Sequence, residues 1–193
     1  MKKSLMIGLM GAMTLVACNQ EKEKVEDQFN YTVEQFADLQ LLRFKVHGFE
    51  ELPLKQKELV YYLSEAALQG RDILFDQNGK YNLIIRKMLE VVYTDYQGDR
   101  SDANFKNFET YLKRVWFSNG IHHHYAADKF VPGFTPEFFK AALESVDASK
   151  LPLMEGETLD ALCEEVFPVI FDAKIMAKRV NQADGEDLVL TSA

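Results

Sequence analysis

RVWFSNGIHHHYAADKFVP, residues 114–132, joins two segments that have helical patterning. Connections of this length between helices are uncommon, and they tend to be either functional or disordered. This one contains large apolar side chains that argue against disorder, namely Trp116, Phe117, Ile121, Tyr125, Phe130 and Val131. We expect Asn119-Gly120 to end the preceding helix and Pro132-Gly133 to turn the chain. The stretch therefore predicts an ordered loop on a helical scaffold, which is where ligand contacts are sought first.

Apolar periodicity predicts a mainly α protein. Thr32 and Gln35 form a capping box for a first helix that continues past Phe36 to Val46. Further helices are expected over Pro53–Asp76 (with Gly70 inside), over Tyr81–Tyr96, from a Ser101 or Asp102 cap, from Thr135-Pro136 to about Val146, and over Leu159 to about Lys178. Gly70 would fit a close approach by a neighbouring element, and Pro168 should kink or divide the last helix.

The first 17 residues have the pattern of a bacterial signal peptide, with Lys2 and Lys3 followed by a short apolar run. Leu15-Val16-Ala17-Cys18 resembles a lipobox, so we expect cleavage before Cys18 and acylation of its thiol. An ordinary signal peptide or a short anchor are the alternatives. Residues 18–30 are charged and are expected to form a flexible, lipid-anchored tether. The expected location is the bacterial cell envelope, on the periplasmic face or the outer membrane.

Composition excludes one class of partner. The formal net charge is −8, which argues against nucleic acid because phosphate binding needs a basic face. Cys163 lies in a helical pattern and is expected to be a small buried apolar group. In an extended stretch only His122 and His124 could face one metal ion, and no third ligand stands at a known spacing. We assign no metal ligand and no catalytic residue, and expect the histidines to line a pocket or the surface.

Residues 118–132 and residues 59–70 resemble segments of a known enzyme family. Ser118-Asn119-Gly120 and Lys129-Phe130-Val131-Pro132 match the pattern of the N-terminal lobe of dipeptidyl peptidase III, and residues 59–70, LVYYLSEAALQG, resemble one of its helices. The resemblance covers roughly Tyr31 to Leu143. It implies a two-lobed α+β zinc exopeptidase that releases dipeptides from peptide N-termini. The zinc motif of the family, His-Glu-x-x-Gly-His, does not occur in these 193 residues.

The resemblance also implies substrate-cleft residues. Counting back from Lys129, Ala126 stands at the family's glycine, Tyr125 at its phenylalanine and His124 at its serine. These three residues and Asn119 are the predicted substrate-binding set, with Tyr125 as an aromatic wall and His124 as a hydrogen-bonding group. Packing of the loop aromatic on its own scaffold is the alternative. The sequence departs from the family at Ile121-His122-His123 and lacks one residue after Asn119.

These patterns lead to one interpretation and two rivals. We expect residues 31–193 to be the helical N-terminal part of a longer dipeptidyl peptidase III-like domain, with Leu188-Val189-Leu190 beginning a strand. Its partners would be the peptide substrate, the missing zinc-binding lobe and, through the lipid, the membrane. Alone it should neither bind catalytic zinc nor hydrolyse peptides. The rivals are a non-catalytic peptide- or protein-binding lipoprotein and a metal-binding module built on the three histidines.

Overall fold

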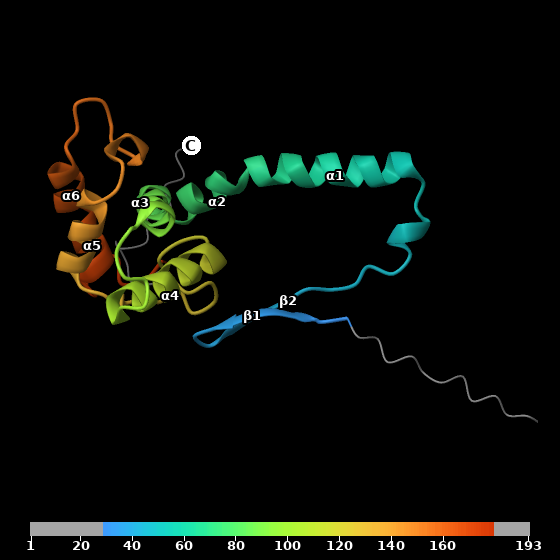
Figure 1. Ribbon diagram of the computed structural model, residues 1–193, viewed down its shortest axis with the longest axis horizontal. Coiled ribbons are helices and arrows are strands. Elements are labelled where there is room, and N and C mark those ends of the chain that lie inside the picture. The colour runs from blue at the N-terminus through green and yellow to red at the C-terminus, as the bar shows by residue number, and fades with distance from the viewer. Residues whose placement is uncertain (1–28, 180–193) are drawn as a thin grey trace, which may run out of the picture.

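The computed structural model describes residues 29–179. The predicted leader, Cys18 and the strand expected at Leu188–Leu190 lie outside this range. The described chain is mainly helical, as the sequence predicts, and it also contains a two-stranded sheet that the sequence analysis did not predict (Figure 1). Its elements are β1 Thr32–Phe36, β2 Leu39–Leu42, η1 Phe49–Glu51, α1 Leu54–Gln69, α2 Arg71–Asn78, α3 Asn82–Asp95, α4 Ala103–Ser118, α5 Pro136–Glu144, η2 Ala148–Lys150 and α6 Leu159–Phe171. No helix among the described residues is long and apolar enough to cross a bilayer.

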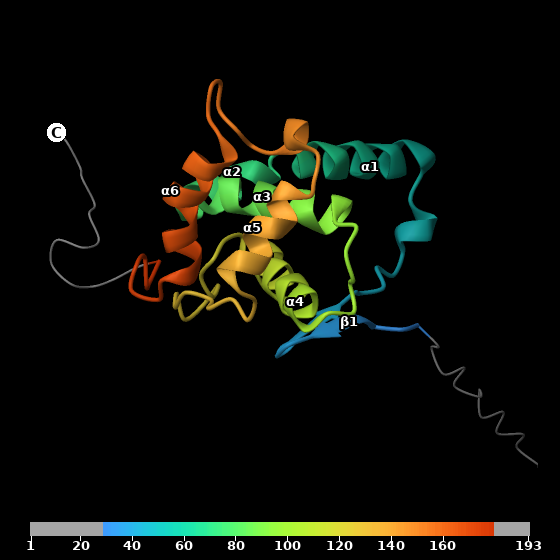
Figure 2. The same cartoon turned by 60° about the vertical axis from the view of Figure 1, so that its left-hand side comes forward.

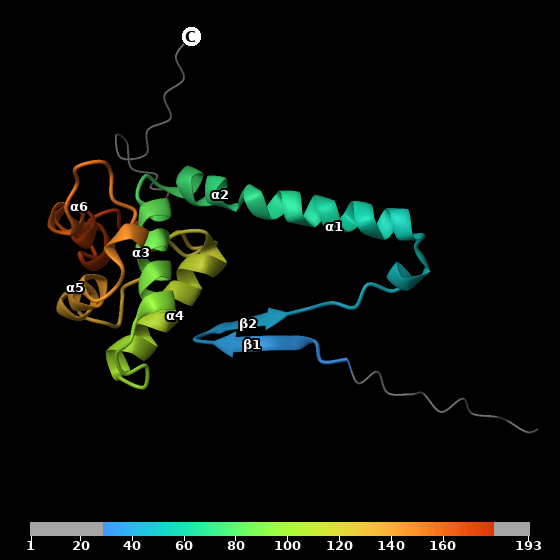
Figure 3. The ribbon, with the colours of Figure 1, turned by 45° about the horizontal axis from the view of Figure 1, so that its top comes forward.

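The hydrophobic core lies between α3, α4, α5 and α6. The predicted apolar faces of α3 and α4 are buried in it, including Ile85, Met88, Phe105 and Phe108. Figures 1 and 3 show α3 and α4 side by side, with α5 and α6 on the side away from α1. Cys163 of α6 is also buried, and this burial raises the pKa of its thiol. The expectation of a buried apolar cysteine is confirmed.

Helix starts follow the predicted caps. The Asp102 side chain accepts a hydrogen bond from the Asn104 N–H at the start of α4, and Thr135 accepts one from Phe138 at the start of α5. Each satisfies a backbone donor that has no partner within its helix. At the other end of α4, Asn119 adopts φ 53°, a left-handed conformation that ends the helix as expected.

The first predicted helix is wrong, because Thr32–Leu42 forms an antiparallel hairpin. Ala37 occupies the tight turn with φ 48°, and Gln40 donates to the Thr32 hydroxyl, which therefore does not serve as a helix cap. Figure 2 shows the hairpin beside α4, where ion pairs hold it. The backbone pairing is between residues three to ten positions apart, and the ion pairs to α4 are the long-range contacts that the helical pattern does not predict.

The second predicted helix is divided at Gly70 into α1 and α2. A Cβ at Gly70 would meet only the Ala67 carbonyl, at 3.5 Å, so no neighbouring element approaches it and that expectation is wrong. No residue of α1 is buried, and its apolar stripe, which includes Leu59 and Leu63, faces solvent. Figure 1 shows α1 as an arm that projects from the helical body.

The last predicted helix ends at Phe171, before the expected Lys178. Pro168 lies inside α6, three residues before this end. Beyond it the chain is drawn into contacts with the loop after α4, because the Lys129 ammonium donates to the carbonyls of Asp172 and Ile175. These contacts are distant in sequence, and the helical pattern does not predict them.

Candidate functional site

A side chain of α3 holds the start of the histidine loop, which comprises residues 119–132. The buried Asn82 accepts a hydrogen bond of 3.2 Å from the Ile121 N–H through Oδ1. Gly120 lies against the same side chain, and a Cβ there would stand 2.4 Å from Asn82 Nδ2. Asn78 of α2 donates to the Asn119 carbonyl at 3.1 Å. The start of the loop is therefore fixed by α2 and α3, and residue 120 has room only for glycine.

Pairing within the loop gives it order. The Phe130 N–H donates to the Ile121 carbonyl, and the His123 N–H to the Asp128 carbonyl, each at 2.8 Å. Ile121 and Phe130 are buried in the core. Between these ends, Ala127 adopts φ 61°, a left-handed turn that is unusual for alanine. The prediction of an ordered aromatic loop is confirmed.

His122 points into the protein. Its ring is 3% exposed, and Nε2 donates a 2.7 Å hydrogen bond to the Met176 carbonyl. Nδ1 has no partner among the described residues. Burial lowers the pKa of His122, and the nearby cations Lys129 and Arg179 lower it further, which outweighs the opposing hydrogen bond. His122 is therefore a neutral structural donor at pH 7.

The expected alternation of the three histidines is wrong. The rings of His123 and His124 stack at 4.4 Å between centroids, while His122 points inward. The reason is that the chain turns at His123, whose Nδ1 accepts the N–H groups of Tyr125 and Ala126 at 3.2 and 3.0 Å. Within residues 29–179, no three His, Cys, Asp or Glu side chains are grouped as a metal site.

The exposed tip of the loop carries three of the predicted substrate-binding residues. Tyr125 is 88% exposed, and its ring contacts that of His124 at 4.3 Å between centroids. His124 Nδ1 lies 3.5 Å from the Ser118 hydroxyl, and the ring contacts Phe117 edge-on. Partial burial and His123 lower the pKa of His124, whereas Asp38 raises it. Ala126 is exposed beside them.

Asn119, the fourth predicted residue, lines a different surface. It borders a cleft of about 350 Å³ together with Arg71, Phe75, Arg86, Glu90 and Trp116. Arg86 is buried and paired with acidic side chains, and the Trp116 indole donates to Glu90 at 2.8 Å. The structure thus brings together His124, Tyr125 and Ala126, and assigns Asn119 to a neighbouring hollow.

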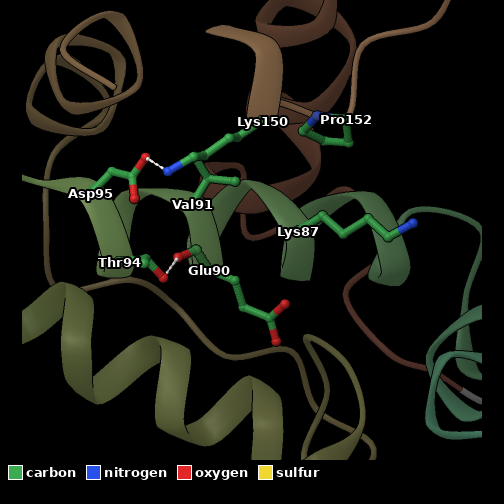
Figure 4. Close-up of a pocket in the computed structure, with 7 residues that line it drawn as sticks. All are labelled: Lys87, Glu90, Val91, Thr94, Asp95, Lys150 and Pro152. Atoms are coloured by element: carbon green, nitrogen blue, oxygen red, sulfur yellow. Dashed lines mark hydrogen bonds and ion pairs between the residues drawn. The ribbon is translucent and has the colours of Figure 1, made fainter. Parts of the chain in front are cut away.

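A further cleft, which the sequence interpretation missed, lies between α3 and the end of η2 with the residues that follow it (Figure 4). It has a volume of about 410 Å³ and is lined by Lys87, Glu90, Val91, Thr94, Asp95, Lys150 and Pro152. The Lys150 ammonium is 2.7 Å from the Asp95 carboxylate, and in Figure 4 the Glu90 carboxylate points away from this pair. The cleft offers paired surface charges, and helical spacing along α3 could have predicted only the α3 side of its lining.

Comparison of the chain with protein-family models and with curated proteins finds no match. The likeness to dipeptidyl peptidase III therefore rests on the motifs of the sequence.

Proposed function

We propose that this chain is the helical N-terminal part of a zinc-dependent dipeptidyl peptidase and supplies part of the cleft that holds the peptide N-terminus. The observation that carries the proposal is the tip of the histidine loop. Tyr125 stands in solvent beside His124 on a loop whose two ends are buried. A rigidly based, exposed aromatic ring with a polar neighbour is a suitable wall for a peptide side chain.

In this proposal the loop binds and orients the substrate. Tyr125 contacts an apolar substrate side chain, and its hydroxyl is free to bond. His124 contributes a ring nitrogen to the peptide. Its lowered pKa keeps that ring neutral at pH 7, so it can accept or donate without adding charge. The residues of the zinc motif would hold the metal, which would supply activation of a water molecule, and in this proposal they would lie on a lobe outside these 193 residues.

The arm formed by α1 supports the proposal of a second lobe. Its exposed apolar side chains include Leu59, Tyr62 and Leu63, each more than half exposed. Apolar patches of this kind usually mark surfaces that another protein segment covers. The same observation favours the alternative function, a lipid-anchored protein at the cell envelope that binds a peptide or a protein without catalysis. The two candidate functions differ in what covers α1, which is the second lobe of the same protein in the peptidase and a separate peptide or protein in the lipoprotein.

The first experiment follows the reading frame of the gene past Ala193. The peptidase proposal expects the frame to reach His-Glu-x-x-Gly-His, and the extended product to release dipeptides from a dipeptidyl naphthylamide. A stop codon directly after Ala193 would remove the peptidase proposal and leave the binding lipoprotein. Zinc-dependent release of dipeptides by the 193-residue chain itself would also contradict it.

Variants of the extended product test the loop. His124→Ala and Tyr125→Ala should each raise KM about tenfold, as expected when one aromatic or polar substrate contact is lost. His47→Ala is the control, since it also removes a histidine, one that is exposed and lies outside both the loop and α1. Unchanged KM in both loop variants would show that the loop does not contact substrate.

A further inference from the structure

The segment Asp172–Arg179 after α6, here called the strap, pairs with the histidine loop along its backbone. The Lys129 N–H donates to the Ala177 carbonyl at 3.0 Å, and the Arg179 N–H donates to the Ala127 carbonyl at 2.9 Å. Asp128 and Lys178 form the antiparallel bridge between these two bonds. Residues 127–129 of the loop therefore pair with the strap along one edge. Along their other edge they pair with the start of the loop, where His122 and Lys129 form an antiparallel bridge.

Side chains of the loop fasten the strap at two further points. The buried His122 ring donates to the Met176 carbonyl. The Lys129 ammonium donates to the Asp172 carbonyl and, at 2.8 Å, to the Ile175 carbonyl. Met176 adopts φ 51°, a left-handed conformation that a methionine rarely adopts unless surrounding contacts hold it.

The strap reaches the predicted peptide-binding residues through Arg179. Its guanidinium lies 3.5 Å from the His124 carbonyl and 3.4 Å from Asn78 Oδ1. Asn78 in turn bonds the Asn119 carbonyl, where the loop leaves α4. Arg179 therefore contacts the tip of the loop directly and is linked to its base through Asn78.

We infer that the strap sets the position of the histidine loop and that Lys129 is the positioning residue that fastens it. This inference rests on the proposed peptide-binding role of His124 and Tyr125. When the strap is docked, Arg179 and the backbone pairing hold the tip in one place. When it is released, the loop loses the backbone pairing on one side and binds peptide less well.

Lys129→Met tests the inference by amide hydrogen exchange in the purified chain. The change keeps the aliphatic stem and removes the two bonds from the ammonium. We expect exchange at the Lys129 and Arg179 amides to rise about tenfold or more, because charge-assisted hydrogen bonds to carbonyls are lost. Exchange at core amides such as Leu89 should not change. Lys129→Arg, which retains donors, should restore part of the protection.

Lys178→Met is the matched control, because it removes an equal charge from the strap itself. Its ammonium lies 3.4 Å from the Asp128 carboxylate at the surface, and both side chains are more than half exposed. We expect wild-type exchange in this variant. Equal effects of the two substitutions, or unchanged exchange in Lys129→Met, would overturn the role of Lys129.

Peptide binding decides whether the strap acts on the site. A fluorescently labelled tetrapeptide is titrated into wild-type chain and each variant, with Tyr125→Ala showing whether the loop binds it. We expect Lys129→Met to weaken binding several-fold and Lys129→Arg to recover it in part. Faster exchange with unchanged affinity would overturn the positioning inference. Absence of tetrapeptide binding in the wild-type chain would also overturn it. Unchanged affinity in Tyr125→Ala would instead count against the proposed function.

Discussion

Arg86 of α3 and Asp72 of α2 are joined by a 2.7 Å hydrogen bond from Nη2 to Oδ1, although the guanidinium is 3% exposed. The same guanidinium lies 3.4 Å from Glu90 and stacks over the Phe75 ring at 4.6 Å. A buried cation is tolerated where carboxylates and an aromatic face replace water. The pair therefore ties the base of the arm to the core, next to the start of the histidine loop.

Replacing Arg86 with Met is expected to lower the free energy of unfolding by about 2 kcal/mol, since a charge-assisted bond and a ring contact are lost. Urea unfolding at pH 7 measures it. Lys140→Met, which removes a surface ion pair between α5 and α6, serves as control and should leave the urea unfolding midpoint close to that of the wild type. Wild-type stability in Arg86→Met would mean that hydrophobic packing replaces the buried pair without loss.

Acid should weaken the contact between Asp72 and Arg86. The hydrogen bond from Arg86 holds the pKa of Asp72 below its usual value, with smaller contributions from nearby cations. A carboxylate with a lowered folded-state pKa stabilises the protein above its unfolded-state pKa, and this contribution is lost as pH falls through the folded-state value. Asp72→Asn should therefore flatten the loss of stability below about pH 4. If Asp72→Asn loses stability at acidic pH as steeply as the wild type does, Asp72 is not a source of that loss.

The two glycines at helix ends should respond in opposite directions to alanine. Gly70→Ala is expected to stabilise the protein by about 0.5–1 kcal/mol, because its φ of −84° suits alanine and the new Cβ meets only an ordinary contact. Gly120→Ala should destabilise by about 1–3 kcal/mol, because the Cβ would collide with Asn82. Thermal unfolding followed by circular dichroism measures both. A destabilised Gly70→Ala variant would show that the break between α1 and α2 is required.

Sequence reasoning succeeded where the determinants are local. The faces of α3 and α4 follow from apolar spacing, as Met88 and Phe108 illustrate, and the Asp102 and Thr135 caps follow from residue type. It failed at Thr32, whose hairpin is held by partners far along the chain, Arg114 being 76 positions from Asp38. Contacts across such separations leave no local pattern.

The same distinction between local determinants and contacts distant in sequence applies to the candidate site. The order of the loop was predictable from its apolar content, whereas the direction of each histidine was not. His122 turns inward because Met176, 54 residues away, offers a carbonyl. The turn at His123 is set by a side chain that accepts two backbone N–H groups, a local signal that a strict alternation rule ignores.

His122 should make stability depend on pH near neutrality. Burial lowers its pKa, so the unfolded chain binds a proton at a higher pH than the folded chain does. Stability is then complete above about pH 6.5, the unfolded value, and falls as pH drops toward the lower folded value. His122→Gln removes this titration while keeping a donor for Met176. Urea unfolding between pH 7 and 5 should show a shallower slope, by at most about 1.4 kcal/mol per pH unit. Equal slopes in both proteins would contradict the burial of a neutral ring.

Two ion pairs join the β1–β2 hairpin to α4. Lys113 lies 2.6 Å from Glu34, and Arg114 lies 2.6 Å from Asp38. An apolar groove of about 260 Å³ remains between the two elements, lined in part by Phe36, Leu41, Trp116 and Phe117. Exposed ion pairs contribute about 0–1 kcal/mol each, and an isolated two-stranded hairpin is marginal in water. The hairpin should therefore detach before the helical core unfolds.

Lys113→Met combined with Arg114→Met should release the hairpin, as should about 1 M salt in the wild type, because exposed ion pairs are screened. Trp116 is the only tryptophan and borders the groove, so its fluorescence should shift to the red while helical circular dichroism stays constant. Lys87→Met controls for loss of a surface charge outside this contact. Fluorescence that changes only together with the loss of helix would show that the hairpin and the core unfold as one unit, and that the apolar contacts outweigh the ion pairs.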